Sequence, residues 1–151
     1  MPMTLNRRTF LSAAAVAISL APASFATAAA RDAEVEEALA AILDGRDAEE
    51  TGITLDVPEV AENGAQVPLT VHVESPMSAD DHVEKIHIVA TRNPTPGIGT
   101  FHLTPTIGRA EVATRIRLAE EQEILVLAEL SDGRVLKAAA EIRVTLGGCV
   151  T

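Results

Sequence analysis

The sequence predicts a mainly β protein: an immunoglobulin-like antiparallel β-sandwich of about seven strands, preceded by one N-terminal α-helix. After residue 51, apolar residues recur at every second position in several short segments, which is the pattern of half-buried strands. Gly, Pro, Asn and Asp separate these segments at short intervals, as expected for turns. Before them, residues 31–45 show the spacing of an amphipathic helix.

The first thirty residues, 1–30, are predicted to be a signal peptide that is removed and takes no part in the fold. Arg7 and Arg8 precede an apolar run at 11–21, the arrangement of a twin-arginine signal. That run is shorter than the roughly 20 residues that cross a bilayer, and the small residues at 26–30 suit a signal peptidase. We therefore expect export to the periplasm with no membrane insertion after processing; a retained N-terminal anchor is the alternative.

The remaining segment, 31–146, is expected to form one domain made of the helix and the sandwich. The apolar stripe of the helix has the spacing i, i+4, i+7, i+8 and consists of Val35, Leu39, Ile42 and Leu43. Gly45 is a natural stop for this helix.

The predicted strands lie at 53–57, 67–73, 83–90, 100–103, 111–118, 123–130 and 135–146. Asn63-Gly64 and Ser131-Asp132-Gly133 are turn signals. The run 124–128 is apolar at every position, which indicates burial on both faces. It is therefore an ordinary core strand, or it is covered by the N-terminal helix or by a second subunit.

The chain is acidic and poor in aromatic residues. Its 151 residues include three Phe and neither Tyr nor Trp, so the core must be aliphatic. Lys and Arg number 12 against 22 Asp and Glu, a net charge of −10; without residues 1–30 the balance is 10 against 22, or −12. This charge argues against nucleic acid or an anionic membrane surface as a partner. An anionic substrate would need positive charge supplied by another protein.

The most distinctive feature is the end of the chain, where 147–151 are predicted to form a flexible arm that presents Cys149. Gly147 and Gly148 give the arm backbone freedom. Cys149 is the only cysteine, and an odd cysteine in an exported protein indicates intermolecular pairing or a reactive thiol. The nearest cationic side chain in sequence is Arg143, so nothing local activates the sulfur. This favours a passive carrier over a cysteine enzyme; an incidental cysteine remains the alternative.

The Gly147-Gly148-Cys149 ending resembles that of the SoxY family, the sulfur-carrier subunit of the periplasmic thiosulfate-oxidising Sox system. Four internal runs share the resemblance: RNPTP at 92–96, TFHLTP at 100–105, GRAEVATRIRLA at 108–119 and AELSDG at 128–133. One departure is that Val150 and Thr151 follow the cysteine where the family usually has two more glycines. A β-branched pair is stiffer than Gly-Gly, which leaves open a diverged paralogue with another substrate.

The resemblance implies a non-catalytic carrier without a cofactor, in which Cys149 holds thiosulfate-derived sulfur as a covalent adduct and Gly147 and Gly148 act as a hinge. It also implies a heterodimer with a SoxZ-like immunoglobulin-like subunit. A haem-containing enzyme would load the carrier, and a hydrolase would release sulfate.

Other polar residues give weaker signals. His72, His82, His87 and His102 lack the spacing of a zinc site, so we expect no metal site and interpret them as surface or interface residues. Arg109, Arg115 and Arg117 form either a solvated charged face or a contact surface for an acidic partner. Two rival functions remain: a structural immunoglobulin-like module whose tail cysteine only links chains, and a thiol enzyme, which would need a histidine close to Cys149.

Overall fold

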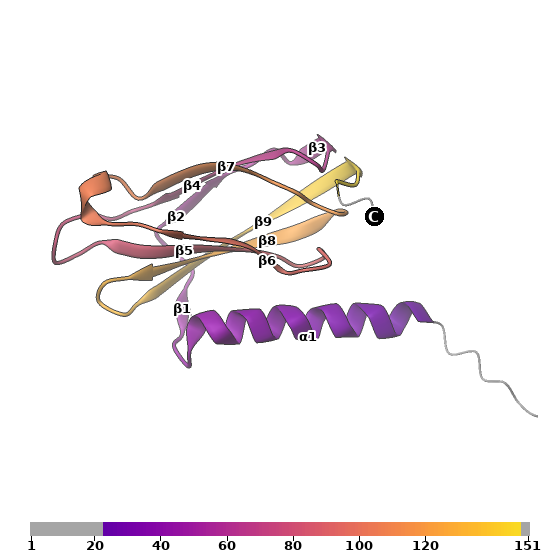
Figure 1. Cartoon of the computed structure of the whole chain (residues 1–151), viewed down its shortest axis with the longest axis horizontal. Helices are drawn as coiled ribbons and strands as arrows, with labels where there is room; N and C mark the ends of the chain where they lie inside the picture. The colour runs from indigo at the N-terminus through magenta and orange to yellow at the C-terminus, as the bar shows by residue number, and fades with distance from the viewer. Residues whose placement is uncertain (1–22, 149–151) are drawn as a thin grey trace, which may run out of the picture.

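A computed structural model describes residues 23–148, with side chains from residue 28 (Figure 1). Arg7, Arg8, Cys149, Val150 and Thr151 lie outside the described residues. The elements are α1 (Ala23–Leu43), β1 (Ala48–Glu49), β2 (Ile53–Asp56), β3 (Val60–Asn63), β4 (Val67–Val73), β5 (Val83–Ala90), β6 (Gly97–His102), the 3₁₀ turn η1 (Pro105–Ile107), β7 (Glu111–Ile116), β8 (Gln122–Leu130) and β9 (Val135–Leu146).

The strands form two sheets, and α1 lies along the outer side of the larger one (Figure 1). The larger sheet has the order β1-β9-β8-β5-β6, with β3 also paired to β9, and the smaller has the order β2-β4-β7. The predicted mainly β fold with one N-terminal helix is therefore confirmed. All seven predicted strands are present, as β2 and β4 to β9.

Two short strands were not predicted, and both run parallel to β9, in contrast to the antiparallel pairing of the other strands. The chain follows the edge of β9 as β1, crosses to the smaller sheet as β2, and returns to β9 as β3. With two and four residues, β1 and β3 are too short to show a reliable alternation of apolar and polar residues. The edge of β9 stays unpaired between Leu136, the last partner of β1, and Arg143, the first partner of β3.

The helix begins at Ala23 instead of at residue 31 as predicted. The expected boundary came from the signal-peptide pattern, whereas the alanine-rich stretch before residue 31 has high helix propensity. At the other end, Asp44 and Gly45 have positive φ values of 48° and 77°, so the left-handed stop expected at Gly45 is confirmed.

Aliphatic side chains fill two separate regions. The larger lies between the sheets and includes Leu69, Ile86 and Ile88, each no more than 1% exposed. The smaller lies between α1 and the larger sheet, where Val35 packs with Leu125 and Leu127. The apolar run of β8 is therefore buried on both faces, and the N-terminal helix provides the cover. This run no longer argues for a second subunit.

Candidate functional site

The end of the chain is held by backbone hydrogen bonds among three segments that are distant in sequence. Gly64 N–H donates to the Leu146 carbonyl at 2.7 Å, and Leu118 N–H donates to the Gly64 carbonyl at 2.8 Å. Gly148 N–H then donates to the Leu118 carbonyl, also at 2.8 Å. We call Gly64, Leu118 and Gly148 the C-terminal clasp. It fixes the backbone up to the residue that immediately precedes Cys149.

Glycine is required in the clasp because the backbones approach too closely for a side chain. A Cβ at Gly148 would collide with the backbone of Gly64 and Ala65, and one at Gly147 would collide with the Ala119 carbonyl. A Cβ at Gly64 would in turn meet the Leu118 carbonyl and lie 2.8 Å from Gly148 N. The hinge role of Gly147 and Gly148 stays a prediction, and close packing is a second physical reason for glycine at both positions.

Two buried amide side chains, Asn93 and Gln122, shape the β7–β8 loop that supplies Leu118. They are 8% and 4% exposed and are the only buried polar side chains among the described residues. Asn93 bonds Arg117 and Ala119, on either side of Leu118. Gln122 bonds Asn93 and the Glu120 carbonyl. Sequence reasoning assigned no role to either residue.

A second polar cluster lies where α1 meets the larger sheet, around Glu129. Its carboxylate is 2.9 Å from Arg46 Nη2, 2.7 Å from His87 Nε2 and 3.5 Å from Lys85 Nζ. His87 Nδ1 also lies 2.9 Å from the hydroxyl of Thr100. Burial would raise the pKa of Glu129, but the hydrogen bonds from His87 and Arg46 and the charges of Lys85 and Arg46 lower it to about 2. This cluster joins helix and sheet, and it was missed by sequence reasoning.

The four histidines lie away from the clasp. His72 pairs with Glu111 at the far end of β4, and His102 pairs with Lys85 near the start of β5. His82 lies beside the turn that follows β8, where its backbone N–H donates to the Ser131 hydroxyl at 3.1 Å. His87 pairs with Leu127 in the middle of β8, roughly 17 Å along the strand from Gln122. A thiol enzyme would need one of these rings near Cys149, and none is placed at the clasp.

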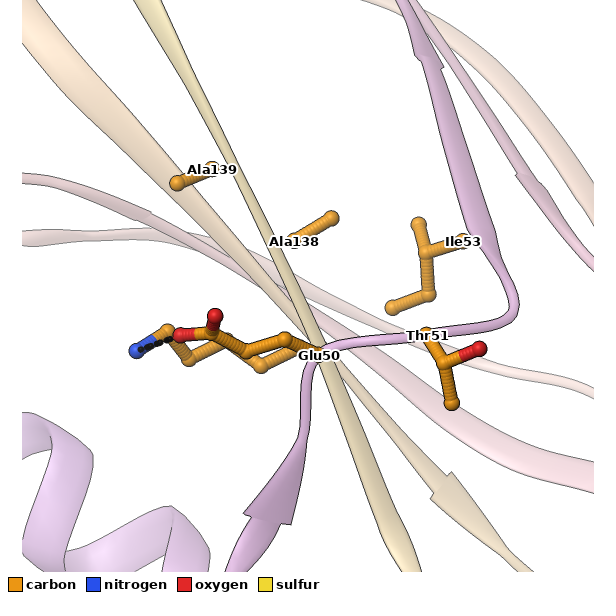
Figure 2. Close-up of a pocket in the computed structure, with 6 residues that line it drawn as sticks. Glu50, Thr51, Ile53, Ala138 and Ala139 are labelled. Carbon is orange, nitrogen blue, oxygen red and sulfur yellow. Dashed lines mark ion pairs between the residues drawn. The ribbon is translucent and has the colours of Figure 1, made fainter.

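Two cavities of the described chain hold no reactive groups in a catalytic arrangement. One, of about 290 Å³, opens where the edge of β9 is unpaired, between Ile53 and Ala138 (Figure 2). Lys137 Nζ and Glu50 Oε1 form an ion pair of 3.3 Å at its rim. Another, of about 310 Å³, lies between α1 and β5–β6 beside His87 and Thr100.

Within residues 23–148, no three side chains of the metal-binding types come together. Arg115 donates to Gln66 at 3.0 Å, and neither it nor Arg109 or Arg117 makes an ion pair in the described chain. The two interpretations given from the sequence, a solvated charged face or a contact surface for an acidic partner, both stay open. No helix in the described part is long and apolar enough to cross a membrane.

Comparison with known proteins assigns the family. The model of the family "sulfur oxidation protein SoxY" matches residues 39–149, from α1 through the single cysteine. The chain belongs to the SoxY family. The resemblance stated from the sequence is thereby confirmed. None of the curated proteins matches the chain by sequence.

Solved structures agree with this assignment. The sulfur carrier protein SoxY from Chlorobium limicola f thiosulfatophilum is 30% identical, with a TM-score of 0.63, and the match covers 76% of this chain and 98% of that one. A superoxide reductase (neelaredoxin) from Ignicoccus hospitalis is 15% identical over 68% of this chain and 85% of that one, with a TM-score of 0.56. A putative superoxide reductase from Thermotoga maritima is 18% identical over 64% and 87%, with a TM-score of 0.53. At these identities, the two reductases share the fold alone with this SoxY-family chain.

Proposed function

We propose that this SoxY-family chain is a periplasmic sulfur carrier that holds thiosulfate-derived intermediates covalently on Cys149 and presents them to partner enzymes. The observation that carries the proposal is the family match, which extends to the only cysteine of the chain. The clasp supports it, because the fold anchors the backbone immediately before that cysteine.

Loading joins the Cys149 sulfur to the outer sulfur of thiosulfate. The new S–S bond gives a Cys–S–S–SO₃⁻ adduct and releases two electrons and the thiol proton, so the step needs an electron acceptor. A haem-containing partner enzyme takes this role. Water then attacks the terminal sulfonate, which leaves as sulfate with a proton while the persulfide Cys–S–SH stays on the carrier; a partner hydrolase performs this step.

The chemistry is assigned to partners because this chain offers little help to the sulfur. No histidine is placed at the clasp, and the net charge of −10 repels an anionic substrate. A SoxZ-like subunit completes the proposed carrier as a heterodimer. Export in folded form by the twin-arginine route would allow a partner without its own signal to travel with it.

The test is the intact mass of the protein purified from the periplasm, with and without reductant. We expect a sulfur-containing adduct that reductant removes and that maps to Cys149. Cys149→Ser should abolish the adduct and sulfur-dependent turnover with the Sox partners, while Thr151→Ser, a matched change in the same tail, should retain both. A bare thiol, or only a homodimer on a non-reducing gel, would instead support a structural module whose cysteine links chains.

A further inference from the structure

We propose that Asn93 and Gln122 are positioning residues for the sulfur-carrying tail. They lock the β7–β8 loop in the shape that lets the Leu118 carbonyl hold Gly148, so that Cys149 leaves the domain from a fixed point. The role of this arrangement in sulfur transfer rests on the proposed function, in which Cys149 is the site of attachment. The hydrogen bonds themselves are independent of that function.

Asn93 lies just after β5 and bonds the loop on both sides of Leu118. Its Nδ2 donates to the Arg117 carbonyl at 2.8 Å, and its Oδ1 accepts from the Ala119 N–H at 2.9 Å. The peptide groups flanking Leu118 are therefore fixed by one side chain. A buried amide that satisfies two backbone groups in this way is costly to remove, because both groups would lose their partners.

Gln122 extends the network at the start of β8. Its Nε2 donates to Asn93 Oδ1 at 2.9 Å and to the Glu120 carbonyl at 3.1 Å, and its Oε1 accepts from the Arg92 N–H at 2.8 Å. Every polar atom of the two amides thus has a protein partner. Since these partners include the backbone of residues 117, 119 and 120, the network serves the same short loop that binds the tail.

The held loop and the glycines together set how far the sulfur can travel. If the arm began after Leu146, residues 147–149 would extend by up to about 10 Å. With Gly148 bonded to Leu118, only one Cα–Cα step of about 3.8 Å separates Cys149 from an anchored residue. In this arrangement a partner that reacts with Cys149 has to come to the surface next to the clasp.

Hydrogen exchange of the Gly148 amide in the whole chain tests the proposal. Asn93→Asp replaces the Nδ2 donor to the Arg117 carbonyl with an oxygen. Gln122→Glu likewise replaces the Nε2 donor to Asn93 Oδ1 and the Glu120 carbonyl. We expect the Gly148 amide to exchange at least about fivefold faster in each variant, the effect of losing a typical hydrogen bond. Ser131→Ala is the matched control. It removes the acceptor of the His82 N–H in the turn at the opposite end of β8, and it should leave the Gly148 rate within about twofold.

A second pair of variants avoids the buried amides altogether. Gly148→Ala disrupts the close backbone contact without touching the core, while Gly97→Ala adds a methyl group where no atom lies within 4 Å. A nitroxide attached to Cys149 should tumble several-fold faster in Gly148→Ala than in the unaltered chain. In Gly97→Ala it should tumble at the unaltered rate. The same label should also gain mobility in Asn93→Asp and Gln122→Glu.

Two results would overturn the proposal. One is a Gly148 amide that exchanges at the rate of an unstructured peptide in the unaltered chain. The other is an increase in Asn93→Asp and Gln122→Glu no larger than in Ser131→Ala. Neither readout depends on whether the protein carries a sulfur adduct. A mobile tail with an adduct would therefore refute the clasp alone. An anchored tail without an adduct would refute the carrier function alone.

Discussion

Replacing Glu129 with Gln tests whether the polar cluster fastens α1 to the sheet. Arg46 follows the helix and donates to the carbonyls of Ile42 and Leu43 at 2.9 and 2.8 Å, while its Nη2 also bonds Glu129 at 2.9 Å. His87 completes the link from β5. Glu129→Gln removes the negative charge that holds these groups, so we expect a less stable protein in which α1 is attached less firmly.

The pKa of Glu129 gives the magnitude and its pH dependence. Lowering this pKa from 4.5 to about 2 corresponds to roughly 3 kcal/mol at about 1.4 kcal/mol per pH unit. Arg46 and Lys85 are 33% and 38% exposed, so solvent screening reduces the expected loss to about 1–2 kcal/mol. Because the folded state lowers the pKa, the stabilisation is fully present above pH 4.5 and is lost as the pH falls toward 2.

Urea unfolding at pH 7 and at several values below pH 4.5 measures this difference. Glu129→Gln should unfold with about 1–2 kcal/mol less free energy at pH 7, and the gap should narrow steadily as the pH is lowered. Glu123→Gln, an exposed change on the same strand, should stay within about 0.5 kcal/mol of the unaltered protein. A gap below about 0.5 kcal/mol at pH 7, or one independent of pH, would refute the reasoning.

Three further substitutions test the packing and the backbone by the same urea unfolding. Leu127 is fully buried beneath α1, so Leu127→Ala should lower the free energy of unfolding by about 2–5 kcal/mol. A loss below about 1 kcal/mol would mean that α1 does not cover this position. Val35→Ala removes apolar surface from the helix side of the same cluster and should cost about 1–2 kcal/mol, with the sandwich still folded. Gly108→Ala places a side chain at φ 74° in open space, so backbone strain alone should cost about 1 kcal/mol; Gly97→Ala is its control, and equal costs for the two would contradict the strain argument.

The sequence predicted the fold where side-chain periodicity is clear. Val67 to Val73 alternate between buried and more exposed positions, which is the pattern that identified the strand. The helix stripe around Val35 and the apolar run of β8 were both visible, and the structure joins them as the two sides of one cluster. The parallel strands β1 and β3 were missed because two and four residues carry no measurable period.

The site was predictable only in part. The lone Cys149 behind two glycines stands out by composition, but the clasp is made of backbone groups at residues 64, 118 and 148 and leaves no pattern in the side chains. Asn93 and Gln122 look like ordinary loop residues until the fold brings them together. Glu129 did leave a signal: a carboxylate that directly follows the apolar run 124–128 needs a partner, and Arg46 could have been sought on the helix that covers it.

The covered face of β8 changes where a partner of the carrier should be sought. Since α1 already occupies that face, its apolar run offers no surface to another subunit. Among the described residues, three large apolar side chains are exposed. Two of them are Val60 on β3, 52% exposed, and Leu146 on β9, 67% exposed. Their two strands pair with each other next to the clasp. Under the proposed function, a protein that takes sulfur from Cys149 has to approach this end of the sandwich, because Cys149 directly follows the anchored Gly148. Hand-over and apolar contact would then occur on the same surface.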